Sequence, residues 1–139
     1  NLRGMVGMDK ADNEKSWDFV HHRAAQADWT QGMRAIFEYR DLGIQEATGG
    51  AFDAHIIRIA DPSADHETGV HAHMTDFQMI YILQGSARFW FDGEGEIEVS
   101  KGSCFYQPDG IMHNALWMSE DCELLEIASP GKFETVTPD

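Results

Sequence analysis

The amino-acid sequence predicts an all-β protein whose strands form an antiparallel sandwich or barrel. Short runs rich in β-branched and aromatic residues follow one another from residue 33 onward, as is typical of partly buried strands. Glycine, proline and aspartate separate these runs and provide turns. No helical pattern lies between them that could connect parallel strands. Antiparallel strands joined by short turns are therefore expected.

The chain is long enough for one domain, because its 139 residues fall in the usual range of a single hydrophobic core. Residues 1–15 show no apolar period, and Ser16 is a suitable N-cap for a short helix over residues 16–25. We expect an N-terminal arm over residues 1–35, a barrel over residues 36–130 and a C-terminal tail over residues 131–139.

The strands are placed by their β-branched and aromatic residues and by the turns between them. Asp92-Gly93, for example, lies between two such runs, and this dipeptide favours a tight hairpin turn. The expected strands are residues 33–40, 51–60, 69–73, 76–84, 86–91, 96–100, 103–107, 112–117 and 123–128.

Charge and composition exclude several classes of function. The formal net charge of −14 opposes contact with phosphate backbones, so neither nucleic acid nor an anionic membrane is expected as a partner. No apolar run approaches the roughly 20 residues of a membrane-spanning helix, and residues 1–10 have no apolar core of a signal peptide. Cys104 and Cys122 lie far apart without a metal-binding spacing. A reducing, cytoplasmic location is expected.

Three histidines have the spacing of metal ligands. His71 and His73 are two residues apart, so on a strand both side chains leave the same face, with Cα atoms about 6.6–6.8 Å apart. Gln78 lies on the next expected strand, and His113 follows a turn; a barrel would bring both opposite the first pair. Imidazole binds several divalent metals, and three nitrogens would leave positions open for water or substrate.

The segments around these residues resemble the two sequence motifs of the cupin superfamily. The first motif, G-x5-H-x-H-x3–4-E-x6-G, is matched by His71, His73 and Gly85, with Gln78 at the place of the glutamate. The second motif, G-x5-P-x-G-x2-H-x3-N, is matched at its first four fixed positions by Gly102, Pro108, Gly110 and His113. The matched segment covers roughly residues 50 to 128.

The chain departs from these motifs at three positions. Asp65 replaces the first glycine, and Trp117 replaces the final asparagine. Gln78 in place of glutamate keeps an acceptor oxygen but loses the negative charge. A metal on neutral ligands would keep its full charge and would attract an anionic substrate more strongly. The sequence leaves open whether the Gln78 amide ligates the metal at all.

The resemblance implies a jelly-roll barrel, also called a double-stranded β-helix, that holds one divalent metal ion. The implied ligands are His71, His73 and His113, with Gln78 as the candidate fourth. Iron is the first expectation, and manganese, nickel, zinc and copper are the alternatives. The resemblance also implies a homodimer, to which the arm could contribute an exchanged strand.

Strand alternation predicts the lining of the pocket. Ile80 and Ile82 share a face with Gln78, and Trp117 shares a face with His113. Arg58 and Arg88 would bind a substrate carboxylate only if they faced inward. For His55, on the strand over residues 51–60, we expect a hydrogen-bonded structural role.

The function expected from these observations is a metal-dependent enzyme acting on a small organic molecule, with a dioxygenase as the first hypothesis. The catalytic residues stay unassigned, because the carboxylate of the first motif is absent and no other general base is evident. The alternative is a non-catalytic protein that binds or senses a small ligand, which the loss of glutamate and an aromatic wall at Trp117 would favour. A metal-free structural barrel is the third hypothesis.

Overall fold

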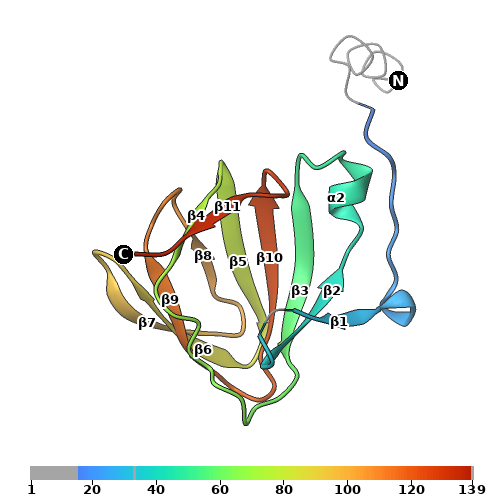
Figure 1. The fold of residues 1–139 in the computed structure, drawn as a ribbon. Helices are drawn as coiled ribbons and strands as arrows, with labels where there is room; N and C mark the ends of the chain where they lie inside the picture. The colour runs from blue at the N-terminus through green and yellow to red at the C-terminus, as the bar shows by residue number, and fades with distance from the viewer. Residues whose placement is uncertain (1–15, 33, 139) are drawn as a thin grey trace.

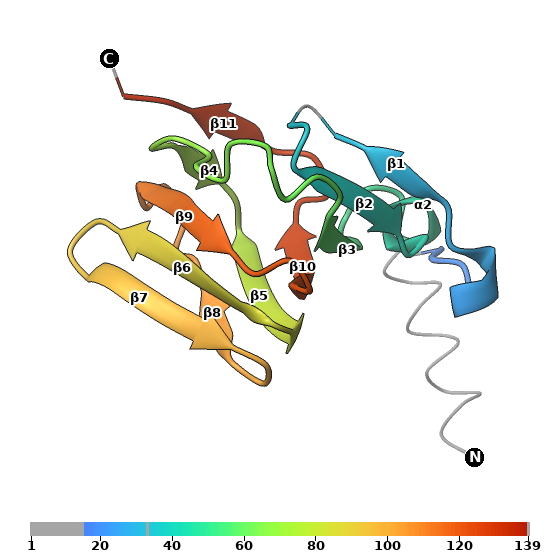
Figure 2. The same cartoon turned by 90° about the horizontal axis from the view of Figure 1, so that it is seen from below.

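The computed structural model describes residues 16–32 and 34–138, and its strands form an open-ended barrel of antiparallel sheets (Figures 1 and 2). Each strand pair in the sheets runs antiparallel, which confirms the predicted all-β class. The strands are β1 Trp29–Gln31, β2 Phe37–Asp41, β3 Asp53–Ile59, β4 Ala72–Met74, β5 Phe77–Gln84, β6 Ser86–Phe91, β7 Gly95–Ser100, β8 Cys104–Tyr106, β9 His113–Met118, β10 Glu123–Ser129 and β11 Glu134–Val136.

Three sheets make up the barrel. A six-stranded sheet has the order β1-β2-β3-β10-β5-β8, a three-stranded sheet has the order β7-β6-β9, and β11 pairs with β4. Seen from below, the three-stranded sheet faces the six-stranded one, and β4 and β11 lie along one side (Figure 2). Neighbours such as β10 and β5 are far from consecutive in sequence, so the barrel forms only when distant segments meet.

The hydrophobic core fills the space between the two larger sheets. Alternate residues of β5 and β6 point into it, as the predicted period of two requires. On β5, for example, Ile80 and Ile82 are buried, whereas Tyr81 is 39% exposed. The buried cluster consists of Ile36, Phe37, Ile80, Ile82, Ala87, Phe89, Phe91, Val99, Ala115, Met118, Cys122 and Leu124.

Gly85 of the first motif allows the chain to turn from β5 into β6. Its φ of 77° lies in the left-handed region, which a residue with a Cβ adopts only at a cost of about 1–2 kcal/mol. A Cβ at this position would also lie 2.8 Å from the Cα of Cys122, a backbone atom. The glycine is therefore required both by its conformation and by the close approach of the β9–β10 connection.

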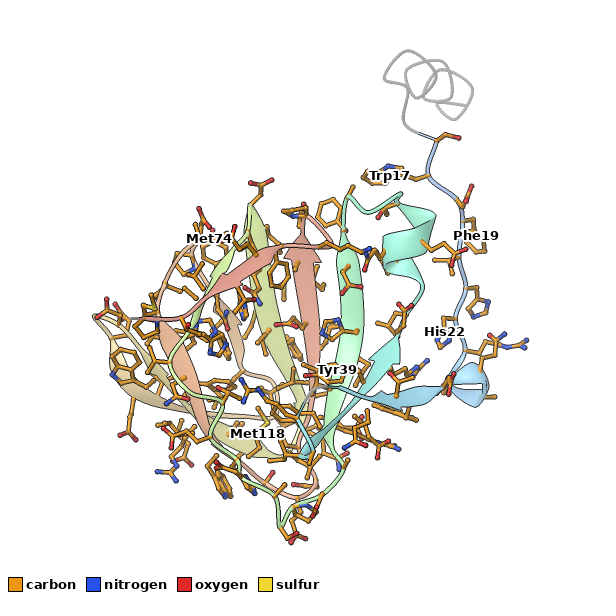
Figure 3. The ribbon with its side chains drawn as sticks, viewed as in Figure 1. Trp17, Phe19, His22, Tyr39, Met74 and Met118 are labelled. Carbon is orange, nitrogen blue, oxygen red and sulfur yellow. The ribbon has the colours of Figure 1, made fainter. Side chains whose placement is uncertain are left out.

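The helix expected over residues 16–25 is wrong. Within the described residues this segment contains only a 3-10 turn, Ala24–Gln26, and the rest lies along the barrel as an extended arm (Figure 3). Tertiary contacts hold the arm, because the Asp18 amide donates to the Ala47 carbonyl at 2.8 Å and Trp17 packs edge-on against Phe52. An extended segment is long enough to make both contacts, whereas a helix of the same residues would be too short to reach them. Residues 1–15 of the expected arm lie outside the described residues.

Three further elements were not expected from the sequence. β1 adds an edge strand to the six-stranded sheet, and the single-turn helix α2, Ile44–Ala47, lies beside β3 (Figure 1). β11 lies in the region expected to be a tail and pairs with β4 through Glu134, Thr135 and Val136. No helix in the described part of the chain is long and apolar enough to cross a membrane.

Candidate metal centre

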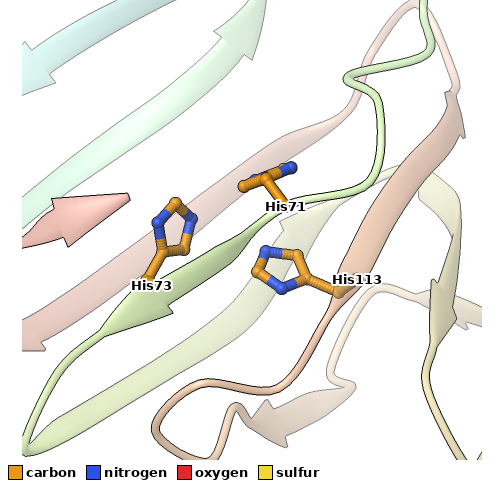
Figure 4. Close-up of side chains that lie close together, drawn as sticks. All are labelled: His71, His73 and His113. Carbon is orange, nitrogen blue, oxygen red and sulfur yellow. The ribbon is translucent and has the colours of Figure 1, made fainter. Parts of the chain in front are cut away.

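The three histidines of the sequence motifs come together at one side of the barrel (Figure 4). His73 lies on β4 and His113 begins β9. His71 precedes β4, and its backbone exchanges two hydrogen bonds with that of His113, at 2.9 and 2.8 Å. One ligand atom from each of the three side chains lies within 4.8 Å of the others. The backbone pairing thus converts distant sequence positions into one cluster.

Each imidazole is held by its Nδ1 atom, which leaves Nε2 for a ligand. Nδ1 of His71 donates to the Gly69 carbonyl at 2.7 Å, and Nδ1 of His113 donates to the Ile111 carbonyl at 3.0 Å. Nδ1 of His73 hydrogen-bonds with the Thr135 hydroxyl at 2.9 Å. A carbonyl only accepts, so in a neutral ring it fixes the tautomer with a lone pair on Nε2. Such outer partners are characteristic of histidines that bind metals.

The environment keeps two of the rings neutral. Burial, together with the nearby rings of His113 and His71, lowers the pKa of His73 to about 4. Burial lowers the pKa of His113 as well. Aromatic contacts hold the same two rings, because Phe91 stacks on His113 and Phe133 packs edge-on against His73 at 5.0 Å. Neutral, oriented imidazoles are the form that binds a metal ion, so the donor set fits a divalent cation.

Gln78 lies inside the barrel, 1% exposed, and its amide contacts a carboxylate that sequence reasoning missed. Nε2 of Gln78 donates to Oε2 of Glu126 at 2.8 Å. The other oxygen of Glu126 accepts from Nε2 of His55 at 2.7 Å, and Nδ1 of His55 donates to Asp53 at 2.9 Å. These four side chains form a polar row across the neighbouring strands β5, β10 and β3. The hydrogen-bonded role expected for His55 is confirmed.

The polar row carries charge. Burial alone would lower the pKa of His55, but its hydrogen bonds to Asp53 and Glu126 raise it to about 10. Burial raises the pKa of Glu126, and the hydrogen bond and positive charge of His55 outweigh this effect, so the pKa lies below its ordinary value. At neutral pH, therefore, an ionised carboxylate and an imidazolium lie together in the barrel. The charge of Glu126 also acts on His73 and His113, whose pKa values it raises.

A second glutamine lies against the cluster formed by His71, His73 and His113. Gln107 is 2% exposed, and its Nε2 lies 3.5 Å from Nε2 of His113. Its backbone amide donates to the Gln78 carbonyl at 2.9 Å. Gln107 immediately precedes the proline of the second motif, so its place is set by that turn. Neither Gln107 nor Thr135 carries a sequence signal that distinguishes it from an ordinary polar residue.

The structure places the other predicted site residues as follows. Ile80 and Ile82 are buried on the same face of β5 as Gln78. Trp117 is 36% exposed and lies 5.8 Å from the guanidinium of Arg88 on the outer side. Arg58 pairs with Glu38 at 3.1 Å and stacks on the ring of Trp29. Neither arginine faces the histidines.

The expectation that Trp117 lines the pocket is therefore wrong, and a β-bulge is the reason. On β6, Phe89 pairs with Ala115, but the preceding Arg88 pairs with Trp117. One residue of β9, Leu116, has no partner at this point, so the alternation that begins at His113 is shifted beyond it. The bulge turns the indole outward beside Arg88 and leaves Ala115 on the inner face.

Comparisons with known proteins agree with this geometry. The sequence model of the cupin domain matches residues 59–128. No curated protein matches the chain. Among solved structures, KdgF from Halomonas sp. is 20% identical with a TM-score of 0.66, covering 81% of this chain and 96% of that one. The polyketide cyclase RemF from Streptomyces resistomycificus is 17% identical, with a TM-score of 0.70 and coverage of 87% and 86%.

A third solved structure, a predicted oxalate decarboxylase from Thermotoga maritima, is 21% identical with a TM-score of 0.63, covering 80% of this chain and 99% of that one. At such identities these likenesses establish a shared fold. They also confirm that the antiparallel sheets form the jelly-roll barrel expected from the motifs.

Replacement of Thr135 tests the contribution of β11 to the cluster. Thr135→Val keeps the shape of the side chain but removes the hydroxyl that holds Nδ1 of His73. We expect affinity for Zn²⁺ to fall about tenfold, as for other outer partners of metal ligands, and Thr135→Ser to keep it. Chelator competition measures the affinity. Equal affinity of Thr135→Val and the unchanged protein would show that the ring is oriented without this hydroxyl.

The raised pKa of His55 predicts how stability depends on pH. His55 binds its proton more tightly in the folded state than in the unfolded state. Its contribution to the free energy of unfolding is therefore complete below the unfolded pKa of 6.5 and is lost as pH rises towards about 10. The free energy of unfolding should fall by up to about 1.4 kcal/mol per pH unit. Urea unfolding between pH 6.5 and 9 measures this slope.

His55→Gln is the control for this slope, and it should remove the dependence in that window. The window excludes Cys122 and Tyr39, whose pKa values are also raised by burial but start from 9.0 and 10.0. A slope that persists in His55→Gln would assign the effect to another group.

Proposed function

Since this chain belongs to the cupin family, we propose that it is a metalloenzyme that binds one divalent ion on His71, His73 and His113 and acts on a small organic substrate. The observation that carries the proposal is the convergence of three imidazoles within 4.8 Å, each with its Nδ1 atom already engaged. Gln78 is the proposed fourth ligand. Ferrous iron is the first candidate, and manganese, nickel, zinc and copper are the alternatives.

A bound ion would supply Lewis-acid chemistry, and redox chemistry in the case of iron, at positions that the protein leaves open. The three imidazoles orient that ion, and the apolar side chains of Ile80 and Ile82 form a dry wall on the Gln78 face. Glu126 adds an ionised carboxylate to the same interior.

The enzyme hypothesis is favoured over a ligand sensor, because neither of the two arguments for a sensor, the lost glutamate and the aromatic wall at Trp117, is supported by the structure. Trp117 lies on the outer side of the barrel and forms no wall. A carboxylate is present beside the position of the motif glutamate, because Glu126 on a neighbouring strand accepts a hydrogen bond from Gln78. The names of two proteins of similar fold, a polyketide cyclase and a predicted oxalate decarboxylase, also denote enzymes acting on small organic molecules.

Within this proposal, a ferrous dioxygenase is the first reaction class, and proton-transfer chemistry without oxygen is the second. Glu126 and His55 favour the second class, since they form a charged hydrogen-bonded pair in the barrel and the charge of Glu126 acts on His73 and His113. The absence of nucleic-acid and membrane partners and the cytoplasmic location stay predictions from the net charge and composition.

Metal analysis with matched variants tests the proposed centre. We expect about one equivalent of a divalent metal per chain, lost in His71→Ala/His113→Ala because two of three nitrogen ligands are removed. His21→Ala, which changes an exposed histidine outside the cluster, should keep the metal. Turnover of a panel of small organic acids, with and without oxygen, then separates the two reaction classes. A chain that binds none of the five metals, even after add-back, would contradict the proposal.

We also propose that the protein forms a homodimer through the outer face of β5 and β8. Phe77, Tyr81, Leu83 and Tyr106 are each 37–53% exposed on this face, and contiguous exposed apolar side chains are typical of interfaces. Light scattering should give twice the chain mass of 15.6 kDa. Tyr106→Glu should give monomers through charge repulsion, whereas Trp117→Glu on the opposite sheet should stay dimeric. A monomeric unchanged protein would contradict this assembly.

A further inference from the structure

The carboxylate that the first motif lacks at position 78 is present one strand away. Gln78 and Glu126 lie on the adjacent strands β5 and β10, where Ala128 is the direct partner of Gln78 and Glu126 that of Ile80. Residues two apart on a strand share a face, so both side chains point into the barrel. Their contact is a 2.8 Å hydrogen bond from Nε2 of Gln78 to Oε2 of Glu126.

This contact fixes which end of the amide faces the interior. A carboxylate only accepts hydrogen bonds, so it selects the NH₂ end of Gln78 and repels the oxygen end. Gln78 is 1% exposed, which prevents water from competing for the same donor. Oε1 is thus directed away from Glu126.

Gln78 is close to the ligand cluster through the backbone as well. Its carbonyl accepts a 2.9 Å hydrogen bond from the amide of Gln107, and the side chain of Gln107 lies 3.5 Å from Nε2 of His113. The charge of Glu126 is felt by the rings of both His73 and His113. Gln78 thus contacts the carboxylate directly and is joined to the cluster through Gln107.

We propose that Glu126 is a positioning residue of the metal centre, whose carboxylate holds and polarises the Gln78 amide so that Oε1 completes the coordination of the ion. The inference rests on the proposed metal site. A hydrogen bond to an ionised acceptor is shorter and stronger than a neutral one. It draws the amide proton towards Glu126 and leaves more negative charge on Oε1. Carboxylates act in this way behind metal-binding histidines. Here the carboxylate of Glu126 acts through the amide of Gln78, and we call this arrangement the relay.

The rest of the polar row keeps Glu126 ionised and in place. Placing a carboxylate in an apolar barrel is costly unless it is paired and hydrogen-bonded. His55 supplies both, at 2.7 Å, and Asp53 holds the other side of that ring at 2.9 Å. Tyr39 packs edge-on against His55, with ring centroids 5.6 Å apart. The carboxylate cannot rotate away from Gln78 without losing the His55 contact.

A double-mutant cycle on metal affinity tests the relay. Affinities for Zn²⁺ and Co²⁺ are measured by chelator competition in the unchanged protein, Glu126→Gln, Gln78→Ala and the variant with both changes. Each single change should weaken binding about 10- to 100-fold. Because the positioning effect of Glu126 passes through Gln78, the double variant should bind within a few-fold of Gln78→Ala, and the small remainder is the direct effect of the Glu126 charge on His73 and His113. Losses that multiply in the double variant would overturn the relay.

Exchange of the two residues gives a stronger test. In the variant Gln78→Glu/Glu126→Gln, the carboxylate ligates directly and the amide donates to it from behind. Affinity should return to within a few-fold of the unchanged protein, although each position has lost its native residue. The absorption spectrum of bound Co²⁺ should change in the same direction in Glu126→Gln and Gln78→Ala, and more strongly in Gln78→Ala, since the first variant weakens the Oε1 ligand and the second removes it. No recovery on exchange would show that Glu126 has only a structural role.

Two further variants separate positioning from folding. Glu38→Gln changes a carboxylate that pairs with Arg58 at 3.1 Å on the same six-stranded sheet, away from the cluster, and should leave affinity and the Co²⁺ spectrum unchanged. Glu126→Asp is the substitute variant if Glu126→Gln does not fold. It keeps the charge but shortens the reach to Gln78, so it should also weaken metal binding. Failure of the unchanged protein to bind metal would overturn the proposed function. Metal binding that is indifferent to Gln78→Ala would overturn the relay alone.

Discussion

The pairing of His71 with His113 is the interaction on which the site depends. Two reciprocal backbone hydrogen bonds, at 2.9 and 2.8 Å, join the segment before β4 to the first residue of β9. β4 pairs with β11, and β9 belongs to the three-stranded sheet, so this bridge is where two sheets of the barrel meet. Closure of the barrel and assembly of the three imidazoles are therefore the same event. A change that opens this contact would separate the three imidazoles.

The opposite wall imposes a different constraint, because it places charge in an apolar interior. A carboxylate on β10 and an imidazolium on β3 are stable there only as a pair. Removal of one partner would leave the other as an uncompensated charge, which is much more destabilising than removal of both. The strands β3, β10 and β5 therefore have to stay in register for the row to exist. This requirement connects the geometry of the six-stranded sheet to the chemistry that faces the histidines.

The sequence predicted most of the strands and the three histidines, because period-two alternation and turn residues are local signals. It failed where tertiary contacts decide. The bulge at Leu116, which turns Trp117 outward, depends on the partner strand β6 and leaves no mark in β9 alone. The extended arm replaces the expected helix through contacts with Ala47 and Phe52. Thr135 reaches His73 only because β11 folds back onto β4.

Glu126 is different, since a signal for it was present. Leu124, Glu126 and Ala128 lie on one face of β10. Leu124 is 1% exposed and Ala128 is 2% exposed, so Glu126 lies between two core residues. A charge between two core residues is expected to have a buried partner and is a candidate for function. When the sequence is compared with the motif position by position, the comparison shows that Gln78 is not a glutamate but does not include Glu126. In a sheet, however, position 78 and its neighbours on β10 lie on one face, so a carboxylate on either strand borders the same interior. The loss of a motif carboxylate is therefore evidence against catalysis only after the adjacent strands have been searched for its replacement.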